Sequence, residues 1–249
     1  MASSFSRSHE LAVPALTLVF AYYENPGMLE FQWEQMAQYP EEIRSAIEVI
    51  VVDDASPTHP AYSVPRPKEL PAASIFRIDH DVRWNQDAAR NIGAHEAQGQ
   101  WLLLTDIDHV VPPESLRTLI SLPRDEKNFY SLGRTKFFGS HPQKPHPNSY
   151  LMTKSLYWSI GGHDEDYAGI YGKDFLFRKR AMKKAQEVHL PDVVLARVGS
   201  TAVKDAGTTT ISRRNTRWKQ AWGYLLEGLK ALRLWRGVQT LSHPYRRVL

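Results

Sequence analysis

Two aspartates, separated by a single residue, follow an apolar run in the middle of the chain. Asp106 and Asp108 come directly after the run 101–105. Two carboxylates at the end of a strand can reach one hard cation, directly or through water. Oxygen ligands suit Mg²⁺ or Mn²⁺, and such ions typically bridge to substrate phosphates. The spacing therefore predicts a divalent metal at Asp106 and Asp108. His109 could add a nitrogen ligand, although a helix cap or a surface histidine suits it better.

Polar residues also follow two other apolar runs. The run 16–21 leads into Tyr-Tyr-Glu-Asn at 22–25, and the run 47–52 leads into Asp53 and Asp54. In parallel sheets, ligands bind beyond the carboxyl ends of the strands, so this convergence indicates a binding site. The two aspartates either cap the turn before Ser56 and Pro57 or accept an N–H group from a nucleobase.

Arg90, Asn91 and Gly93 stand within a helix predicted at 86–97. A glycine inside a helix costs about 1 kcal/mol relative to alanine, so Gly93 needs a reason in packing or close approach. The Arg90 guanidinium either neutralises carboxylates or a diphosphate, or forms a structural ion pair.

The segment 161–174 combines glycines with four acidic residues. Asp164 and Glu165 follow a pair of glycines, and Asp174 precedes a helical pattern that starts at Phe175. An acid at the start of a helix is commonly a cap. It can also act as a general base where it faces an acceptor hydroxyl.

These residues depend on an alternation of strands and helices. Apolar runs at 16–21, 47–53, 74–78 and 101–105 predict strands, and the intervening patterns predict helices at 26–36 and 86–97. This alternation favours a parallel sheet in an α/β domain, and nearly unbroken apolar strands suit a sheet covered on both faces. The stretch 112–147, rich in Pro, Lys and His, is predicted to be an irregular loop over the site.

Composition excludes several classes of site. The 249 residues include no cysteine, which rules out disulfides, thiolate metal sites and a cysteine nucleophile. No stretch approaches the ~20 apolar residues of a membrane span. The first residues lack the features of a signal peptide, so a cytoplasmic protein is expected.

The charge is uneven along the chain. The net charge is +4, yet residues 200–249 hold ten Lys or Arg against two acids, a net +8. Residues 212–236 are predicted to be helical, with one apolar stripe that docks on the rest of the chain and with Lys219 and Lys230 pointing away. The stripe consists of Trp218, Trp222, Leu225, Leu229 and Leu232. The basic residues, including Arg213 and Arg214, form either a solvated face or a site for an anionic partner.

The order of these motifs resembles a family 2 glycosyltransferase with the GT-A fold. The resemblance covers about Leu16 to Lys184 and rests on the segments 51–56, 89–93, 104–108, 161–165 and 171–174. It implies a GT-A, Rossmann-like α/β fold, with a mostly parallel mixed sheet flanked by helices. The expected division is a catalytic domain at 14–199 and a basic, aromatic-containing helical extension at 200–249 packed on it.

The resemblance implies roles on the donor side. Asp54 would meet the uracil N3–H, and the base would be lined by Tyr22, Tyr23 and Asn25. Asp106 would approach the ribose or the waters of the metal, and Asp108 would ligate Mn²⁺ or Mg²⁺. Relatives commonly end the first strand in Tyr-Asn, whereas this chain has Tyr-Glu-Asn.

On the acceptor side, Asp174 occupies the position of the catalytic base, with Asp164 and Glu165 near the acceptor. Relatives often carry Glu where this chain has Lys173, and a cation there would favour the ionised form of Asp174.

The expected reaction is a single in-line displacement from a nucleotide-sugar, catalysed by a hexosyltransferase-type enzyme. Asp174 removes a proton from the acceptor hydroxyl, which attacks the anomeric carbon and inverts it. The metal and Arg90 offset the charge that grows on the diphosphate leaving group.

The identity of the acceptor stays open. A saccharide or lipid-linked saccharide is the first expectation. DNA carrying a hydroxymethylated pyrimidine is an alternative that the basic, aromatic-containing tail suits. A non-catalytic module that binds sugar nucleotides is a third, against which the intact Asp106, Asp108 and Asp174 argue. A nucleotidyltransferase usually needs a Gly-rich loop bearing Lys or Arg after the first strand, which residues 22–27 do not provide.

Overall fold

The structure is a computed structural model that describes residues 13–139, 141–173, 175–207 and 217–249. A ten-stranded sheet runs through the molecule in the order β10-β3-β2-β1-β4-β8-β6-β9-β5, with β7 paired to β6. Its parallel core consists of β1 (Leu16–Tyr22), β2 (Ile47–Asp53), β3 (Ala72–Ile78) and β4 (Trp101–Asp106).

The rest of the sheet is mixed. Strand β8 pairs antiparallel with β4 and with β6, whereas β9 runs parallel to β6. Strand β10 pairs antiparallel with the outer edge of β3. The bounds are β5 (His109–Val110), β6 (Asn128–Lys136), β7 (Pro142–Gln143), β8 (Tyr150–Thr153), β9 (Gln186–Arg197) and β10 (Tyr245–Arg247).

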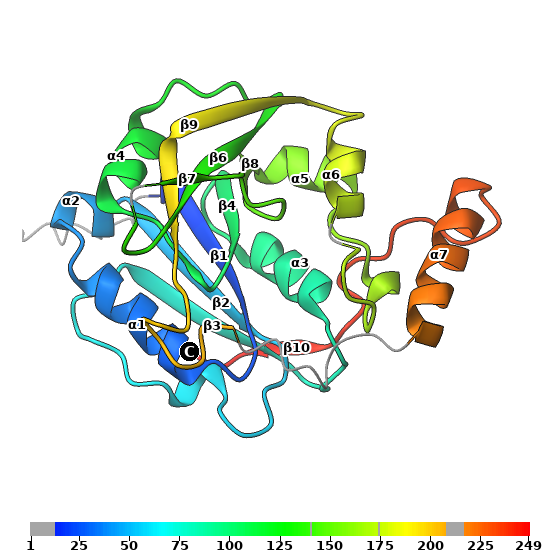
Figure 1. Cartoon of the computed structure of the whole chain (residues 1–249), viewed down its shortest axis with the longest axis horizontal. Coiled ribbons are helices and arrows are strands. Elements are labelled where there is room, and N and C mark those ends of the chain that lie inside the picture. The colour runs from blue at the N-terminus through cyan, green and yellow to red at the C-terminus, as the bar shows by residue number, and fades with distance from the viewer. Residues whose placement is uncertain (1–12, 140, 174, 208–216) are drawn as a thin grey trace, which may run out of the picture.

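Helices cover both faces of the sheet (Figure 1). One face packs against α1 (Pro26–Ala37), α2 (Glu41–Arg44) and α4 (Pro113–Ser121), and the other packs against α3 (Gln86–Glu96), α5 (Lys154–Ile160) and α6 (Phe175–Ala181). In β1, alternate residues serve the two cores, because Leu18 and Phe20 face α1 while Val19 faces α3. Two short 3₁₀ helices, η1 (Ala61–Ser63) and η2 (Glu165–Tyr167), complete the connections.

The predicted α/β fold with a mostly parallel sheet is confirmed, and so are the four predicted strands and the first two helices. The prediction that 112–147 is irregular is wrong, because this stretch contains α4, β6 and β7. Pro113 stands in the first turn of α4, where its missing N–H has no intrahelical partner to lose. Leu116 and Leu119 then bury one face of that helix.

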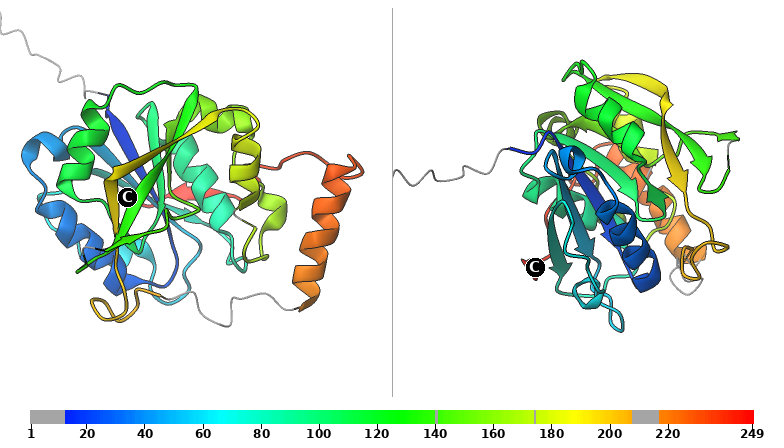
Figure 2. Two further views of the ribbon diagram at one scale, coloured as in Figure 1. Left: turned by 45° about the horizontal axis from the view of Figure 1, so that its top comes forward. Right: turned by 90° about the vertical axis from the view of Figure 1, so that its left-hand side faces the viewer.

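The C-terminal region contains helix α7 (Arg217–Ala231) and strand β10, so it is not purely helical. Figures 1 and 2 show α7 at the rim of the molecule, outside the helices that cover the sheet. The prediction that its apolar stripe docks on the domain is wrong, because Trp218, Trp222 and Leu225 are exposed. The helix instead contacts the domain through the neighbouring face that carries Gly223 and Leu226.

Candidate active site

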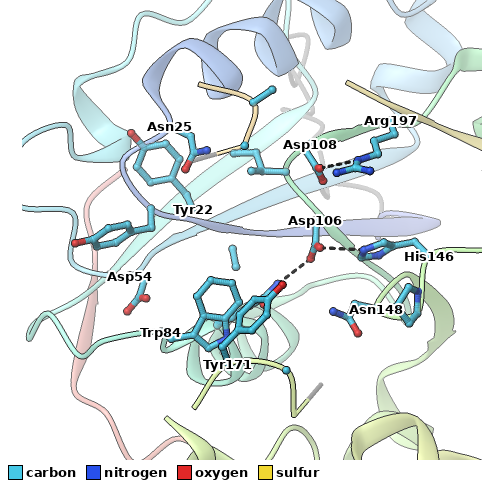
Figure 3. Close-up of a pocket in the computed structure, with 18 of the residues that line it drawn as sticks. Tyr22, Asn25, Asp54, Trp84, Asp106, Asp108, His146, Asn148, Tyr171 and Arg197 are labelled. Atoms are coloured by element: carbon cyan, nitrogen blue, oxygen red, sulfur yellow. Dashed lines mark hydrogen bonds and ion pairs between the residues drawn. The ribbon is translucent and has the colours of Figure 1, made fainter. Parts of the chain in front are cut away.

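A cavity of about 660 Å³ opens at the carboxyl ends of β1, β2 and β4 (Figure 3). Six of the residues predicted to bind the donor or the metal line it together: Tyr22, Tyr23, Asn25, Asp54, Asp106 and Asp108. These residues come from three separate strand ends. The parallel register of the strands brings their ends to one edge of the sheet, as the sequence predicts.

The neighbouring aspartates at the end of β2 do different work. Asp53 is fully buried, and its carboxylate accepts hydrogen bonds from the Ser56 and Ala61 backbones and from Arg77 at 2.7–2.9 Å. Asp53 therefore fixes the turn after the strand. Asp54 lines the cavity, and its Oδ2 accepts a 3.1 Å bond from the backbone N–H of Asn85.

The segment after β1 is held by its extra residue. Glu24 adopts a positive φ of 50°, and its Oε1 accepts the backbone N–H groups of Thr58 and His59 at 2.8 and 3.0 Å. The buried Tyr22 donates its hydroxyl to the His59 carbonyl at 2.5 Å. The insertion in Tyr-Glu-Asn therefore ties the turns after β1 and β2 together and leaves Asn25 on the cavity wall.

Asn25 also meets a segment from the far end of the sequence. Its Nδ2 donates to the Asp205 carbonyl at 2.9 Å, and the Asp205 carboxylate accepts the Gly27 N–H at 2.8 Å. Ala206 and Gly207, which follow directly, line the cavity. The stretch after β9 is thereby fastened to the start of α1 at the edge of the site.

Asp106 is held by groups from two other elements. Its Oδ1 accepts hydrogen bonds from Arg90 at 2.5 Å and from Gln86 at 2.7 Å, both on α3. His146 Nε2 lies 3.4 Å from Oδ2. Burial by itself would raise the pKa of the Asp106 carboxyl, but the Arg90 guanidinium, with smaller contributions from the neighbouring His146 and His109, outweighs burial and lowers the pKa. Asp106 is therefore an ionised, fixed carboxylate.

Asp108 stands two residues further along on the same wall. Its Oδ1 lies 2.7 Å from His109 Nδ1, and its Oδ2 lies 3.4 Å from Arg197 Nε. Arg134 lines the same part of the cavity. His109 is buried and does not line the cavity, so it contacts Asp108 from behind.

Helix α3 links several of the motifs through one turn. Arg90 reaches Asp106, while Asn91 donates to the His163 carbonyl at 2.8 Å and to Glu165 Oε1 at 2.7 Å. Gly93 faces β1, where an added Cβ would lie 2.2 Å from Val19 Cγ1. Arg90-Asn91-x-Gly93 is thus the motif that fixes β1, the Asp106 wall and the 161–165 segment relative to one another.

The acidic segment after α5 packs against the C-terminal region. The Glu165 carboxylate accepts the backbone N–H groups of Leu241 and Ser242 at 2.6 and 2.7 Å. Asp164 Oδ2 accepts a 2.7 Å bond from Lys230. Neither Asp164 nor Glu165 lines the cavity, so the predicted contact with the acceptor stays a prediction.

Asp174, the predicted base, lies outside the described residues. Its flanking residues Gly172 and Phe175 line the same cavity as Asp106 and Asp108. Lys173 turns the other way, with its Nζ 3.1 Å from Glu227 and 3.9 Å from the Tyr224 ring centroid.

With the geometry described, a comparison with known families becomes informative. The model of the family described as "Glycosyl transferase family 2" matches residues 18–185, more than half of the chain. The chain belongs to glycosyl transferase family 2. The matched residues include most of β1, all of β2, β3 and β4, and the whole of the motif series from Asp54 to Lys173.

Solved structures confirm the fold of this glycosyl transferase family 2 chain. Residues 1–349 of TarS from S. aureus match 74% of it at 16% identity, with a TM-score of 0.59. The mannosyltransferase PcManGT from Pyrobaculum calidifontis, in complex with GDP-Man and Mn²⁺, matches 91% at 19% identity, with a TM-score of 0.57. The chain spans 60% and 66% of these two structures. Comparison with curated proteins found no match.

The glycosyltransferase cavity also contains residues that the sequence did not point to. Trp84, with a positive φ of 53°, packs edge-on to Tyr171 with ring centroids 4.6 Å apart (Figure 3). His146, Arg134 and Arg197 come from the stretch read as irregular and from β9. These three are scattered among ordinary surface residues in the sequence, and the clustered Pro and His at 141–147 is their only signal.

The carboxylates of the cavity limit how a divalent metal could be held. Among the residues that the structure describes, no three His, Asp or Glu side chains gather into a metal cage. Mg²⁺ and Mn²⁺ usually bind through one or two carboxylates and complete their shell with water and substrate phosphates. Asp106 and Asp108 therefore fit a cation that arrives together with a diphosphate.

No helix within the described part of the chain is both long and apolar enough to cross a membrane.

Proposed function

We propose that this family 2 glycosyltransferase moves a sugar from a UDP-sugar to an acceptor hydroxyl with the help of Mn²⁺ or Mg²⁺. The observation that carries the proposal is the meeting of Asp54, Asp106 and Asp108 on the wall of one cavity. One of the matched structures holds UDP-GlcNAc, and another holds GDP-Man with Mn²⁺.

The donor half of the cavity has the groups that a nucleoside diphosphate needs. Asp54 offers an acceptor to the uracil N3–H, and Tyr23, Asn25 and Trp84 line the same space. Asp106 faces the ribose or the waters of the metal. Arg90 is buried against Asp106, so its effect on the donor acts through that carboxylate. Arg134 and Arg197 supply positive charge beside the diphosphate.

The metal would be held by Asp108 with Asp106 beside it. When bound, such a cation offsets the charge that develops on the leaving diphosphate. Asp174 accepts the proton of the acceptor hydroxyl, the hydroxyl oxygen bonds to the anomeric carbon, and the bond to the diphosphate oxygen breaks. One displacement of this kind inverts the anomeric centre.

A saccharide or a lipid-linked saccharide is the acceptor that we propose. The DNA alternative depended on the basic, aromatic-containing tail with Arg213, Arg214, Arg217, Trp218 and Lys219, of which Arg217 and Trp218 are exposed. Arg213 and Arg214 lie outside the described residues. Lys230 faces the domain and pairs with Asp164, and Lys219 approaches Gly169. The helix therefore gives no specific support to a nucleic-acid acceptor.

Thermal unfolding with nucleotides tests the donor assignment. A ligand that binds the native state raises the melting temperature by mass action. We expect UDP or a UDP-sugar with Mn²⁺ to raise Tm, and Mn²⁺ alone to have little effect because the protein supplies only two carboxylates. A larger shift with a guanine nucleotide would redirect the base assignment. No shift with any nucleotide would overturn the proposal.

A further inference from the structure

Helix α7 presents an apolar face to solvent. Trp218 is 86% exposed, Leu225 54% and Leu232 69%, and Trp222 lies between them at 43%. Trp218, Trp222 and Leu225 are spaced four and three apart, and Leu232 follows seven residues later, directly after the end of the helix, so the four side chains form one stripe. Beyond the helix, Leu234 and Trp235 extend the same apolar region. Three of the seven tryptophans of the chain lie within residues 217–236.

The domain side of α7 is a different face. Leu226 packs with Tyr167, Ile170 and Leu176 in a small separate core. An added Cβ at Gly223 would lie 3.0 Å from Ile170 Cγ2, so the missing side chain lets the helix approach closely. The face of α7 that carries Gly223 and Leu226 therefore packs on the domain, and the face that carries the tryptophans is exposed to solvent.

The exposed stripe is held in a fixed orientation. Lys230 Nζ lies 2.7 Å from both Asp164 Oδ2 and Asp166 Oδ2, and the Trp235 indole N–H donates to Asp166 at 3.1 Å. This brings the ring of Trp235 to 6.0 Å from that of Trp222 in an edge-on pair. Burial acts to raise the pKa of Asp166, but bonds from Arg236 and Lys230 lower it, so the anchoring carboxylate stays charged.

Charge identifies what covers this face. Residues 217–236 hold five Lys or Arg against one Glu. Two of these cations, Lys230 and Arg236, pair with Asp164 and Asp166 of the domain, whereas Arg217 and Arg233 are exposed next to Trp218 and Leu232. Like charges meeting across an interface are unfavourable, which argues against a second copy of the same face. Leucines gain little from a phosphate backbone, which argues against DNA. Tryptophan and leucine bordered by cations suit the boundary of an anionic bilayer.

We propose that the face formed by Trp218, Trp222, Leu225 and Leu232 docks on the surface of an anionic lipid bilayer. The apolar side chains enter the headgroup region, and the flanking arginines meet the lipid phosphates. The chain is thereby held at the membrane surface without a helix that spans it.

This docking also bears on the acceptor, a step that rests on the proposed function. Lys173 contacts Glu227 and Tyr224 of α7, and its neighbours Tyr171 and Phe175, the latter at the start of α6, line the cavity. The docked face and the cavity rim thus belong to one connected unit. A lipid-linked saccharide held in the same bilayer is the acceptor class that this arrangement serves.

Vesicle sedimentation of the full chain tests the docking. The probes are vesicles of phosphatidylcholine alone and of phosphatidylcholine mixed equally with phosphatidylglycerol. The test variant replaces Trp218, Leu225 and Leu232 with serine. The control replaces Tyr62 and Phe138, which are exposed elsewhere, with serine. We expect the wild-type chain and the control to sediment with the anionic vesicles. The test variant should bind more than about tenfold more weakly, since each buried side chain contributes substantially to partition.

The proposal is overturned by wild-type chain that stays in the supernatant, by equal vesicle binding of the test variant, or by a dimer in ultracentrifugation that the test variant converts to monomer. The proposal would also be overturned if the wild-type chain bound duplex DNA and not vesicles, and if the test variant lost this binding to DNA. The shift of Tm with UDP and Mn²⁺ should be the same in all three proteins. A missing shift with intact vesicle binding would count against the transferase assignment and leave the docking in place.

Discussion

At the scale of single residues, the site separates side chains that the sequence presents as equivalent. Asp53 and Asp54 are neighbours, yet alternation along β2 sends one into the turn and the other to the cavity. Asp106 and Asp108 are both on the wall, but Asp106 accepts short hydrogen bonds from Arg90 and Gln86. Asp108 has one short contact, from Oδ1 to the buried His109, and its Oδ2 has a longer contact of 3.4 Å with Arg197. Asp108 is therefore the carboxylate better placed to ligate a cation.

Replacing Asp108 tests this assignment. Asp108→Asn preserves the shape and the contact with His109 but removes the charge. We expect the transfer rate to fall by on the order of 10²–10³-fold, because loss of a metal removes several kcal/mol of charge stabilisation. The Tm shift with UDP and Mn²⁺ should shrink with it. Asp192→Asn, an exposed position on β9, serves as the control and should behave as wild type. Full activity of Asp108→Asn, or undiminished activity of the wild-type chain in excess chelator, would refute the metal role.

Asp174 is tested by the same substitution with a different expected pattern. Asp174→Asn removes a basic carboxylate but leaves the donor site intact. The Tm shift with UDP and Mn²⁺ should persist while transfer falls by about 10²–10⁴-fold. Near-normal transfer would place the base elsewhere, and Asp164 would be the next residue to test.

His163 predicts how stability depends on pH. Burial lowers its pKa well below the usual 6.5, and the cations Arg90 and Arg180 lower it further. The unfolded chain takes up a proton below pH 6.5 that the folded chain refuses, so stability is lost as pH falls from 6.5 towards the folded pKa. His146, whose pKa burial lowers to about 4, adds an effect of the same sign. The free energy of unfolding, measured by denaturant titration, should decrease on acidification below pH 6.5.

The contribution of His163 is isolated by His163→Gln. The variant loses the stack on Phe177 and is less stable at every pH. Its slope below pH 6.5 should be shallower than that of wild type by up to about 1.4 kcal/mol per pH unit, the value for one proton. Identical slopes would show that His163 is not kept neutral by the fold.

At the scale of elements, α3 is the part that aligns the site. One turn of this helix contacts Asp106 through Arg90, the 161–165 segment through Asn91, and β1 through Gly93. The sequence indicated that a glycine inside a helix must serve packing or close approach. It could not show that Gly93 makes room for Val19 of β1, because a local sequence pattern does not contain contacts between elements. A helix that touches three parts of the site cannot shift without moving all of them.

Gly93→Ala measures how closely α3 packs on β1. The added methyl group would meet Val19 Cγ1 at 2.2 Å, so we expect a loss of about 1–3 kcal/mol in the free energy of unfolding. The matched control is Gly228→Ala in α7, where an added Cβ meets no atom within 4 Å. There the better helix propensity of alanine should stabilise the chain by up to about 1 kcal/mol. If both substitutions stabilise, the close contact of α3 with β1 is not present in solution.

At the scale of the whole molecule, the C-terminal region packs back against the α/β domain. Strand β10 extends the sheet at β3, and the Glu165 carboxylate accepts hydrogen bonds from the backbone N–H groups of Leu241 and Ser242. The acidic segment that the sequence assigned to the acceptor therefore also serves as an anchor for the end of the chain.

Glu165→Ala distinguishes anchoring from acceptor contact. Removal of the carboxylate leaves the buried Asn91 amide and the partly buried N–H groups of Leu241 and Ser242 without their partner, which should cost about 1–3 kcal/mol of stability. The control Glu42→Ala breaks an exposed pair with Arg117 and should cost less than about 1 kcal/mol. A raised KM for the acceptor with unchanged stability would contradict the anchoring role and support acceptor binding.

The sequence predicts the parallel core well, because its strands are apolar and their partners lie close in the chain order. It fails where a residue depends on distant contacts. Pro113 lies in a Pro-rich stretch that suggests irregular structure, yet it is the first residue of helix α4. The stripe that contains Trp218 has the pattern of a buried helix face but is exposed, because Gly223 lets the neighbouring face pack on the domain. Arg134 and Arg197 reach the site only through the pairing of β6 with β9, which no local pattern encodes.

The bond between Asp205 and Gly27 has an electrostatic consequence for the donor. The first N–H groups of a helix carry roughly half a positive charge and commonly bind phosphate. Helix α1 begins beside the cavity, but a carboxylate from 178 residues away already caps its first turn. In the proposed donor complex, the field that attracts the diphosphate comes from Arg134, Arg197 and a bound cation. Nucleotide affinity should therefore depend on ionic strength and on free divalent metal, because this helix dipole is already neutralised by the chain itself.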